Sequence, residues 1–319
     1  MPQLPFRKAS SYHDVPPVTW LARPWIVQGS ITEIIGTQKD AGKTTMIMRG
    51  LVAAILTGGT FLGQRVMKGP VIYFTENPPI VVRKDLEKAG IMDHPDLYML
   101  QWHDVPGTDW KTLMTKLRAD VKELGAVLVV VDTLSHFALG IGESENDTNV
   151  AIEIVKPLIR LASEGVSVLT VRHEPKVSGR SPAKAGRGAS AFSGAVDIVL
   201  RLRRKGGAVR PGIRILEGRG RFEETPEETI IELTPTGYIQ ISKKGGTDPI
   251  RDAILAALVS GALSLPDLVD TIKQKKSILA SALDEMITEG IITQNGSAAL
   301  PRFHLKEISK DDQKAVDNT

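Results

Sequence analysis

The sequence predicts an α/β fold whose main unit is a largely parallel, twisted sheet covered by helices on both faces, followed by a small second unit. Short β-branched runs alternate with helical stretches over residues 31–242, each pair about one βα unit long. The run at residues 126–131 is apolar without interruption, which is typical of a parallel strand buried on both faces. From residue 250 the pattern changes to three helices and a hairpin. We therefore expect a core domain over 31–242 and a second unit over 250–306.

The composition of the 319-residue chain is that of an ordinary globular protein, with 42% hydrophobic residues. The chain has no cysteine, which excludes disulfides, thiolate metal sites and thiol catalysis. Its net charge of +3 is small, so a basic binding surface has to come from local clustering. No apolar run approaches the roughly 20 residues of a membrane span, and the first residues lack the pattern of a signal peptide. We expect no membrane association and a cytoplasmic location.

The stretch Ile34–Thr45 joins an apolar strand, a glycine-bearing loop and a helix without a break. In such a loop the backbone N–H groups and the positive end of the helix point at one spot, which favours a polyphosphate. Lys43 would reach the β- and γ-phosphates of a nucleotide, and the Thr44 hydroxyl would take one Mg²⁺ coordination position. The sequence therefore predicts a phosphate-binding loop formed by Thr37, Gln38, Lys39, Asp40, Ala41, Gly42, Lys43, Thr44 and Thr45.

This loop departs at one position from the usual pattern G-x-x-x-x-G-K-[ST]. Thr37 stands where the first glycine belongs, and Gly36 comes one residue early. A Gly-Lys-Thr triplet also occurs in ordinary surface loops. The β-branched run before it and the mostly apolar helix after it favour the phosphate-binding interpretation.

Residues 1–30, ahead of this loop, are rich in proline and tryptophan and predict an irregular lead-in. A tryptophan in this stretch could stack on the base of a bound nucleotide. Packing on the edge of the core is the role that we expect for it.

Two further strands of the predicted sheet end in a carboxylate. The strand over residues 71–75 is followed by Glu76 and then by two prolines, which stop a strand. Ligands of open parallel sheets bind at the carboxyl ends of the strands, so Glu76 is expected at the site. The buried run at 126–131 ends in Asp132, which is a Walker B pattern. Asp132 would hold the Mg²⁺ ion through a water molecule, opposite Thr44.

Two alternatives stay open around Asp132. An aspartate that ends a buried strand can instead cap the helix that follows. His136, just beyond, is expected to be a polar neighbour and not a metal ligand, because no second metal-binding residue lies at a useful spacing.

The strand over residues 166–173 ends in His173, which could sense the γ-phosphate. The stretch from Lys176 to Ser190 has four basic side chains among small residues and no acid: Lys176, Arg180, Lys184 and Arg187. A basic loop of this kind is often only a solvated surface. Its position after a strand of the nucleotide-binding sheet favours contact with nucleic acid.

The remaining strands of the core are expected over residues 196–202, 213–216, 229–232 and 238–241, the last ones antiparallel at the edge of the sheet. A linker at 243–249 leads to three helices and a hairpin in the order of a winged helix. Lys273, Lys275 and Lys276 enter its third helix, which fits contact with phosphates and equally a solvated helix start. Whether this unit binds DNA or protein stays open. Residues 307–319 are expected to be disordered.

With these motifs in place, the chain resembles the RecA-like P-loop ATPases, in particular the plasmid RepA-type hexameric replicative helicases, with the KaiC and RadA types further off. The resemblance spans about residues 18–242. It rests on four segments: Phe74–Pro78, Val131–Ser135, Val171–His173 and Arg187–Asp197. Arg172 stands where RepA-type helicases often have a second histidine, and the winged-helix unit is not covered.

The resemblance implies ATP and Mg²⁺ as cofactors and Glu76 as the catalytic base that polarises the attacking water. It implies Arg219, with Arg221 as second candidate, as the arginine that acts on a neighbouring subunit. The basic stretch from Lys176 to Arg187 would match the loop that grips single-stranded DNA inside a ring. The partners implied are therefore single-stranded DNA and further copies of the chain, in a hexameric ring.

Two classes of function follow from these features. In the first, the protein is an ATP-driven motor on single-stranded DNA, a replicative DNA helicase of the RepA type. In the second, it is a regulatory or assembly ATPase that recruits a partner through its winged helix and does not unwind DNA. ATPase activity stimulated by single strands and displacement of an annealed strand are expected only in the first class.

Overall fold

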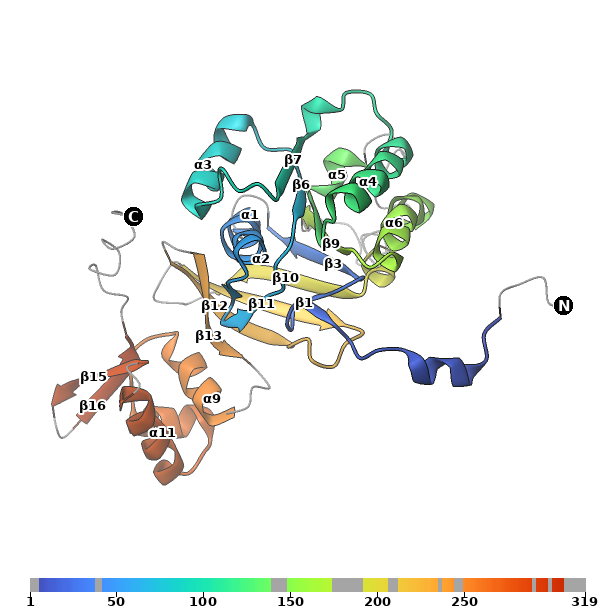
Figure 1. The fold of residues 1–319 in the computed structure, drawn as a ribbon. Coiled ribbons are helices and arrows are strands. Elements are labelled where there is room, and N and C mark those ends of the chain that lie inside the picture. The colour runs from blue at the N-terminus through green and yellow to red at the C-terminus, as the bar shows by residue number, and fades with distance from the viewer. Residues whose placement is uncertain are drawn as a thin grey trace.

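The computed structural model describes residues 6–37, 42–138, 148–173, 192–205, 212–234, 237–243, 249–288, 291–297 and 300–306. Figure 1 shows a body built on one large sheet, with the N-terminal stretch projecting from it and the C-terminal unit packed beside it. The basic residues Lys176, Arg180, Lys184 and Arg187, the loop residues 38–41, most of the linker and the tail 307–319 lie outside the described residues.

The central sheet has nine strands within the described ranges, and most of its neighbouring pairs are parallel. The strands from β10 to β7 run parallel, whereas β11, β12 and β13 extend one edge in antiparallel fashion. The predicted α/β class with a mainly parallel sheet is confirmed. In spatial order the strands are β13 (Gly237–Lys243), β12 (Glu228–Thr234), β11 (Ile213–Gly220), β10 (Ile198–Arg204), β3 (Ile31–Gly36), β9 (Ser167–His173), β8 (Leu128–Asp132), β6 (Val71–Thr75) and β7 (Leu97–Gln101).

The parallel register places the carboxyl ends of four strands at one edge of the sheet. Gly36 at the end of β3 pairs with His173 at the end of β9, and Thr75 at the end of β6 pairs with Asp132 at the end of β8. Asp132 also pairs with Val171, two residues before the end of β9. Side chains that follow these four strands are therefore brought together.

Helices cover both faces of the sheet (Figure 1). The helical stretch after β3 runs through α1 (Lys43–Thr45), the π-helical turns η2 (Met46–Val52) and α2 (Ala53–Thr57), and α3 (Pro79–Ala89) packs against it. On the other face lie α4 (Trp110–Leu124) and α6 (Thr148–Ser163). Shorter elements are β4 (Thr60–Phe61), β5 (Gln64–Arg65), η3 (Trp102–Asp104) and α5 (Leu134–Phe137).

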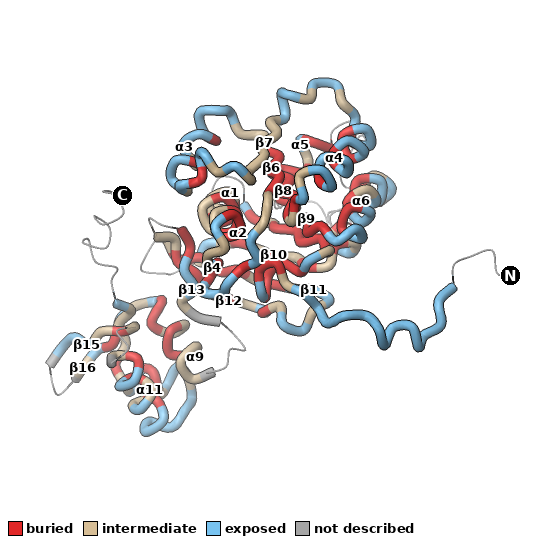
Figure 2. The backbone as a smooth tube through the Cα atoms, in the orientation of Figure 1, coloured by how far each residue is buried: buried red, intermediate tan, exposed pale blue. Residues whose placement is uncertain are grey.

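Strand β8 shows how one strand serves both cores. Leu128 and Val130 pack with the helices around η2, while Val129 and Val131 pack with α4 and α6. All four side chains are fully buried because successive residues of a strand point to opposite faces and both faces are covered. Figure 2 shows the same burial along the neighbouring parallel strands.

The lead-in 1–30 is only partly irregular, which corrects the expectation from the sequence. It contains the 3₁₀ helix η1 (Ala9–Asp14) and the short strands β1 (Trp20–Ala22) and β2 (Ile26–Val27). Trp25 is 1% exposed and belongs to the core, and the ring of Trp20 lies edge-on to Phe222 at 5.8 Å. Both tryptophans therefore have a packing role, because apolar residues of this small hairpin complete one face of the sheet.

The C-terminal unit has its own apolar core and a separate three-stranded sheet. Its elements are α9 (Pro249–Leu258), β14 (Leu263–Ser264), α10 (Leu265–Ile272), α11 (Lys276–Thr288), β15 (Ile292–Ser297) and β16 (Leu300–Leu305). Helix α10 begins with a capping box, since Ser264 accepts from the Asp267 N–H and Asp267 accepts from the Ser264 N–H. Val259 packs with Ile213 and Ile230, which joins the unit to the edge of the large sheet. Its identification as a winged helix and the domain boundaries stay predictions.

Within the described ranges, no helix is both long enough and apolar enough to cross a membrane.

Candidate functional site

A cleft of about 270 Å³ opens at the edge of the sheet where the parallel strands end. Its walls combine the loop after β3, the residues that follow β6 and β8, and the tip of β9. The predicted site residues that the structure brings together here are Thr37, Gly42, Lys43, Thr44, Thr45, Glu76, Asp132 and His173. Gln38, Lys39, Asp40 and Ala41 lie outside the described residues.

Gly42 sets the direction of the chain as it enters the helix. Its φ of 82° is left-handed, and a Cβ at this position would overlap the hydroxyl of Tyr238 on β13. Only glycine meets both conditions without strain. Helix α1 therefore begins directly at Lys43 and points its free N–H groups toward the cleft.

The Lys43 ammonium group lies inside the loop and is held by backbone oxygens. Its Nζ donates to the Gly36 carbonyl at 2.7 Å and to the Thr37 carbonyl at 3.2 Å, and it lies 3.4 Å from His173 Nδ1. The residue is 6% exposed. A buried ammonium at a glycine-bearing turn and a helix start differs from a solvated surface lysine, which favours the phosphate-binding interpretation.

Asp132 connects the Walker B strand to the helix start. Its Oδ2 accepts from the Thr44 hydroxyl at 3.0 Å and from the Tyr73 hydroxyl at 2.8 Å. Asp132 does not cap the next helix, because the N-cap residue of α5 is Thr133. The helix-cap alternative is therefore wrong.

Burial is the main influence on the pKa values of Asp132 and Tyr73. It raises the pKa of Asp132, and the hydrogen bonds from Tyr73 and Thr44 oppose that rise. Burial, reinforced by the negative charge of Asp132, raises the pKa of Tyr73 well above its ordinary value. The phenol of Tyr73 therefore keeps its proton and remains a hydrogen-bond donor to the carboxylate.

Thr44 and Asp132 together fit a magnesium ion. A hydroxyl and a carboxylate are the oxygen ligands that Mg²⁺ takes in nucleotide sites, usually with phosphate oxygens and water completing the shell. The Thr44 hydroxyl and Asp132 Oδ2 lie 3.0 Å apart, so both can act on one ion, with Asp132 acting through a water molecule.

Glu76 lines the cleft next to Asp132 and is held by the turn after β8. Its backbone N–H donates to the Asp132 carbonyl at 3.0 Å. The Thr133 hydroxyl donates to Glu76 Oε2, and His136 Nδ1 contacts the same oxygen. Thr133 and His136 were not predicted as neighbours of Glu76 from the sequence.

His173 completes the cleft beside Lys43. Its pKa is lowered, first because the ring is partly buried and then because the Lys43 ammonium repels a second positive charge, while Glu76 acts in the opposite direction. The imidazole is therefore neutral at pH 7. A neutral ring can still donate one hydrogen bond to an incoming phosphate.

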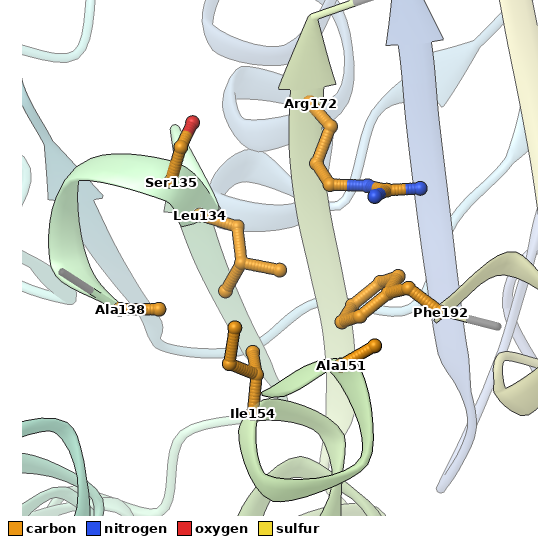
Figure 3. A pocket seen from close by; sticks show the side chains of 7 residues that line it. All are labelled: Leu134, Ser135, Ala138, Ala151, Ile154, Arg172 and Phe192. Carbon is orange, nitrogen blue, oxygen red and sulfur yellow. The ribbon is translucent and has the colours of Figure 1, made fainter. Parts of the chain in front are cut away.

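Arg172, next to His173, has a structural partner. Its guanidinium is paired with the fully buried Glu33 of β3 and lies 4.6 Å above the ring of Phe192. Ser193 donates to the other oxygen of Glu33 at 2.6 Å. Figure 3 shows Arg172 extending from the end of β9 over Phe192. Glu33 therefore fixes both the end of β9 and the residues that resume the described chain at 192.

Arg219 and Arg221 lie away from this cleft. Arg219 pairs with Val199 of β10, which pairs with Glu33, three residues before the end of β3. Arg221 is bound to Asp197 at 3.0 Å, and Asp197 also accepts from the Ile31 N–H at the start of β3. Arg219 is exposed and forms no ion pair within the part of the chain that the structure describes.

We predict that the His173 ring titrates below its ordinary pKa of 6.5. Lys43→Met removes the repelling charge at similar volume, so it should raise the pKa of His173, although burial keeps it below the ordinary value. NMR of the histidine resonances as a function of pH measures the pKa of His173 in the wild-type chain and in Lys43→Met. The variant His173→Gln assigns the His173 signal. Because the unfolded chain binds this proton more readily, His173 makes the free energy of unfolding fall as the pH drops below about 6.5. An unchanged pKa in Lys43→Met would contradict the contact.

Comparison with known proteins supports the same fold. A KaiC-like protein from the hyperthermophilic archaeon Pyrococcus horikoshii has a crystal structure that matches with a TM-score of 0.50 and 17% identity, over 70% of this chain and 99% of that chain. The crystal structure of the RadB recombinase matches with a TM-score of 0.47 and 15% identity, over 68% and 93%. None of the curated proteins matches the chain. The likeness to the KaiC-like protein shows the fold, an α/β core of the RecA-like type.

A family profile described as an AAA domain matches residues 2–179, more than half of the chain. The chain therefore belongs to the AAA domain family.

Proposed function

We propose that the protein is an ATPase that hydrolyses ATP between the subunits of a ring and uses the reaction to move along single-stranded DNA, as a RepA-type replicative helicase. One observation carries the proposal. Lys43, Thr44, Asp132 and Glu76 come from three separate strand ends and converge on one cleft. These are a cation for the phosphates, two Mg²⁺ ligands and a carboxylate base, which are the parts that phosphoryl transfer requires.

The residues that line the cleft would have different roles in the reaction. Lys43 exchanges its two carbonyl partners for phosphate oxygens, which are stronger acceptors because they are charged. Thr44 and Asp132 would hold Mg²⁺, which neutralises charge on the β- and γ-phosphates when it is bound. Glu76 would accept the proton of the attacking water.

The partly exposed His173 ring lies beside Lys43, where it would meet the γ-phosphate of a bound nucleotide. It would change its hydrogen bonds when the γ-phosphate leaves.

The position of Arg219 supports assembly. The spreading charge on the γ-phosphoryl group needs a second cation in the transition state. Arg219 lies about three residues, or roughly 10 Å, back along the strand direction from the end of β3, with β10 between them. It is exposed, and none of the described acids holds it, so it is available to the cleft of a neighbouring copy. Arg221, in contrast, is held by Asp197.

The order of residues supports coupling to a nucleic acid. The basic stretch with Lys176, Arg180, Lys184 and Arg187 follows His173 directly in the sequence. A change in the hydrogen bonds of His173 would therefore be transmitted to the stretch that carries these four cations. Backbone phosphates of a single strand are the ligand class that such a cluster fits.

The first prediction concerns the base. Glu76→Gln should keep nucleotide affinity and lower kcat by roughly 100-fold or more, because the amide cannot accept the proton. Lys43→Ala should instead abolish tight ATP binding. Both are measured by steady-state ATPase kinetics and nucleotide titration, with Glu87→Gln on the exposed side of α3 as matched control. Normal hydrolysis by Glu76→Gln would place the base elsewhere.

A second prediction concerns DNA. Changing Lys176, Arg180, Lys184 and Arg187 to Gln should weaken binding of single strands and flatten its salt dependence, by about 0.7 counterion for each lost contact. ATPase activity without DNA should survive. The matched control changes Lys273, Lys275 and Lys276 to Gln and tests the C-terminal unit in the same assay. Loss of binding only in this control would move the DNA site to that unit.

The same preparations separate the two classes of function. A motor shows ATPase activity stimulated by single strands and displaces an annealed strand. A regulatory ATPase that recruits a partner does neither, and that result would overturn the helicase proposal while leaving the ATPase site in place.

A third prediction concerns assembly. Arg219→Ala and Glu76→Gln subunits should each be nearly inactive, because a trans-acting arginine contributes about 10³-fold or more. Mixing them should restore part of the activity, since a mixed interface can pair an intact Glu76 with an intact Arg219 from the next subunit. Arg118→Ala, on the exposed side of α4, is the matched control. Co-assembled mixtures that stay inactive would exclude a role for Arg219 in trans.

A further inference from the structure

The carboxylate of Glu76 has a one-sided environment. Both of its side-chain contacts in the described part of the chain are made to Oε2, by the Thr133 hydroxyl and by His136 Nδ1. Its other oxygen, Oε1, has no partner there, and Glu76 lines the cleft. The two oxygens of the Glu76 carboxylate therefore have different surroundings.

We propose that His136, together with Thr133, is a positioning residue that fixes Oε2 of Glu76 and so keeps Oε1 directed at the attacking water. This inference rests on the proposed function, because it requires Glu76 to be the base. The terminal torsion of a glutamate is broad, so a carboxylate without fixed partners samples many orientations. The hydrogen bond from Thr133 and the ion-pair contact with His136, both to one oxygen, remove that freedom before the substrate arrives.

The contact with Glu76 determines which ring nitrogen of His136 carries a proton. A carboxylate only accepts hydrogen bonds, and the Thr133 hydroxyl already donates to the same oxygen. His136 must therefore carry its proton on Nδ1 when it contacts Glu76. The Nδ1 atom also lies 3.2 Å from Thr133 Oγ1, which makes the three groups one compact cluster.

Two hydrogen bonds, one to its backbone N–H group and one to its carbonyl, hold His136 in place. Its N–H donates to the Thr133 carbonyl at 3.2 Å. The indole Nε1 of Trp102 donates to the His136 carbonyl at 2.8 Å. Trp102 follows β7, Glu76 follows β6 and His136 follows β8, so the ends of three adjacent strands meet at this carboxylate.

A purely structural role does not account for this arrangement. The His136 side chain is 47% exposed, and an ion pair with that much solvent contact adds little to stability. Removing the imidazole should therefore leave the fold intact. An effect on hydrolysis would then come from the orientation of Glu76.

The test uses the full chain in ATPase assays. His136→Ala should lower kcat roughly 10- to 100-fold, the scale of a misplaced reacting group, with nucleotide affinity unchanged within about twofold. His136→Asn should restore much of the rate, because its amide nitrogen can donate where Nδ1 did. His103→Ala is the matched control, since His103 lies next to Trp102 and faces Asp104 instead of Glu76.

A double-variant cycle shows whether His136 acts through Glu76. In a Glu76→Gln background, His136→Ala should cause almost no further loss, because groups that act as one unit are not additive. An equal loss in both backgrounds would overturn the inference. So would normal kcat in His136→Ala, or an Asn variant as slow as the Ala variant. If Glu76→Gln itself hydrolyses ATP normally, the proposed function fails first, and that result is distinct from all of these.

Discussion

The parallel register of four strands is the constraint on which the site depends. β3, β6, β8 and β9 are joined by backbone hydrogen bonds that level Gly36 with His173 and Thr75 with Asp132. The residues that line the cleft stand at these strand ends, in the segments that follow them, or on helix α3 after β6. A shift of register by one residue would turn Asp132 to the opposite face of the sheet, away from Thr44. The buried apolar residues on both faces resist that shift, so the core and the site are specified together.

The cleft places polar groups in surroundings that would otherwise exclude them. Asp132 is 3% exposed, and a carboxylate so buried is stable only with good hydrogen-bond partners. Tyr73 supplies one partner that burial keeps protonated, and Thr44 supplies another. The same is true of Glu33, which is fully buried and satisfied by Arg172 and Ser193. The polar network thus fixes side chains in place before a ligand adds its own charges.

Periodicity in the sequence predicted the main strands, because β-branched runs and turn residues act locally. It also placed Glu76 and Asp132 at strand ends, and Lys43 and Thr44 at the helix start. What it missed depends on contacts between distant segments. Tyr73 reads as one more apolar residue of a strand, yet its hydroxyl meets Asp132. His136 offered no metal-type spacing, yet it meets Glu76, and Arg172 resembled a departure from a family pattern until Glu33 supplied its partner. The lead-in looked irregular because its strands β1 and β2 are too short to show a period.

The proposed site residues lie at two opposite ends of the parallel strands. Lys43, Thr44, Asp132 and Glu76 line the cleft at the carboxyl ends, while Arg219 lies near the amino ends. The antiparallel pairing of β11 with β10 causes this separation, because it reverses the chain and returns Arg219 toward the start of β10. A side chain cannot cross back over several residues of sheet to its own cleft. Under the proposed function Arg219 would act on the cleft of a neighbouring copy, and the reversal that keeps it from its own cleft leaves it exposed for that contact. Dependence of catalysis on assembly would in this way follow from strand direction.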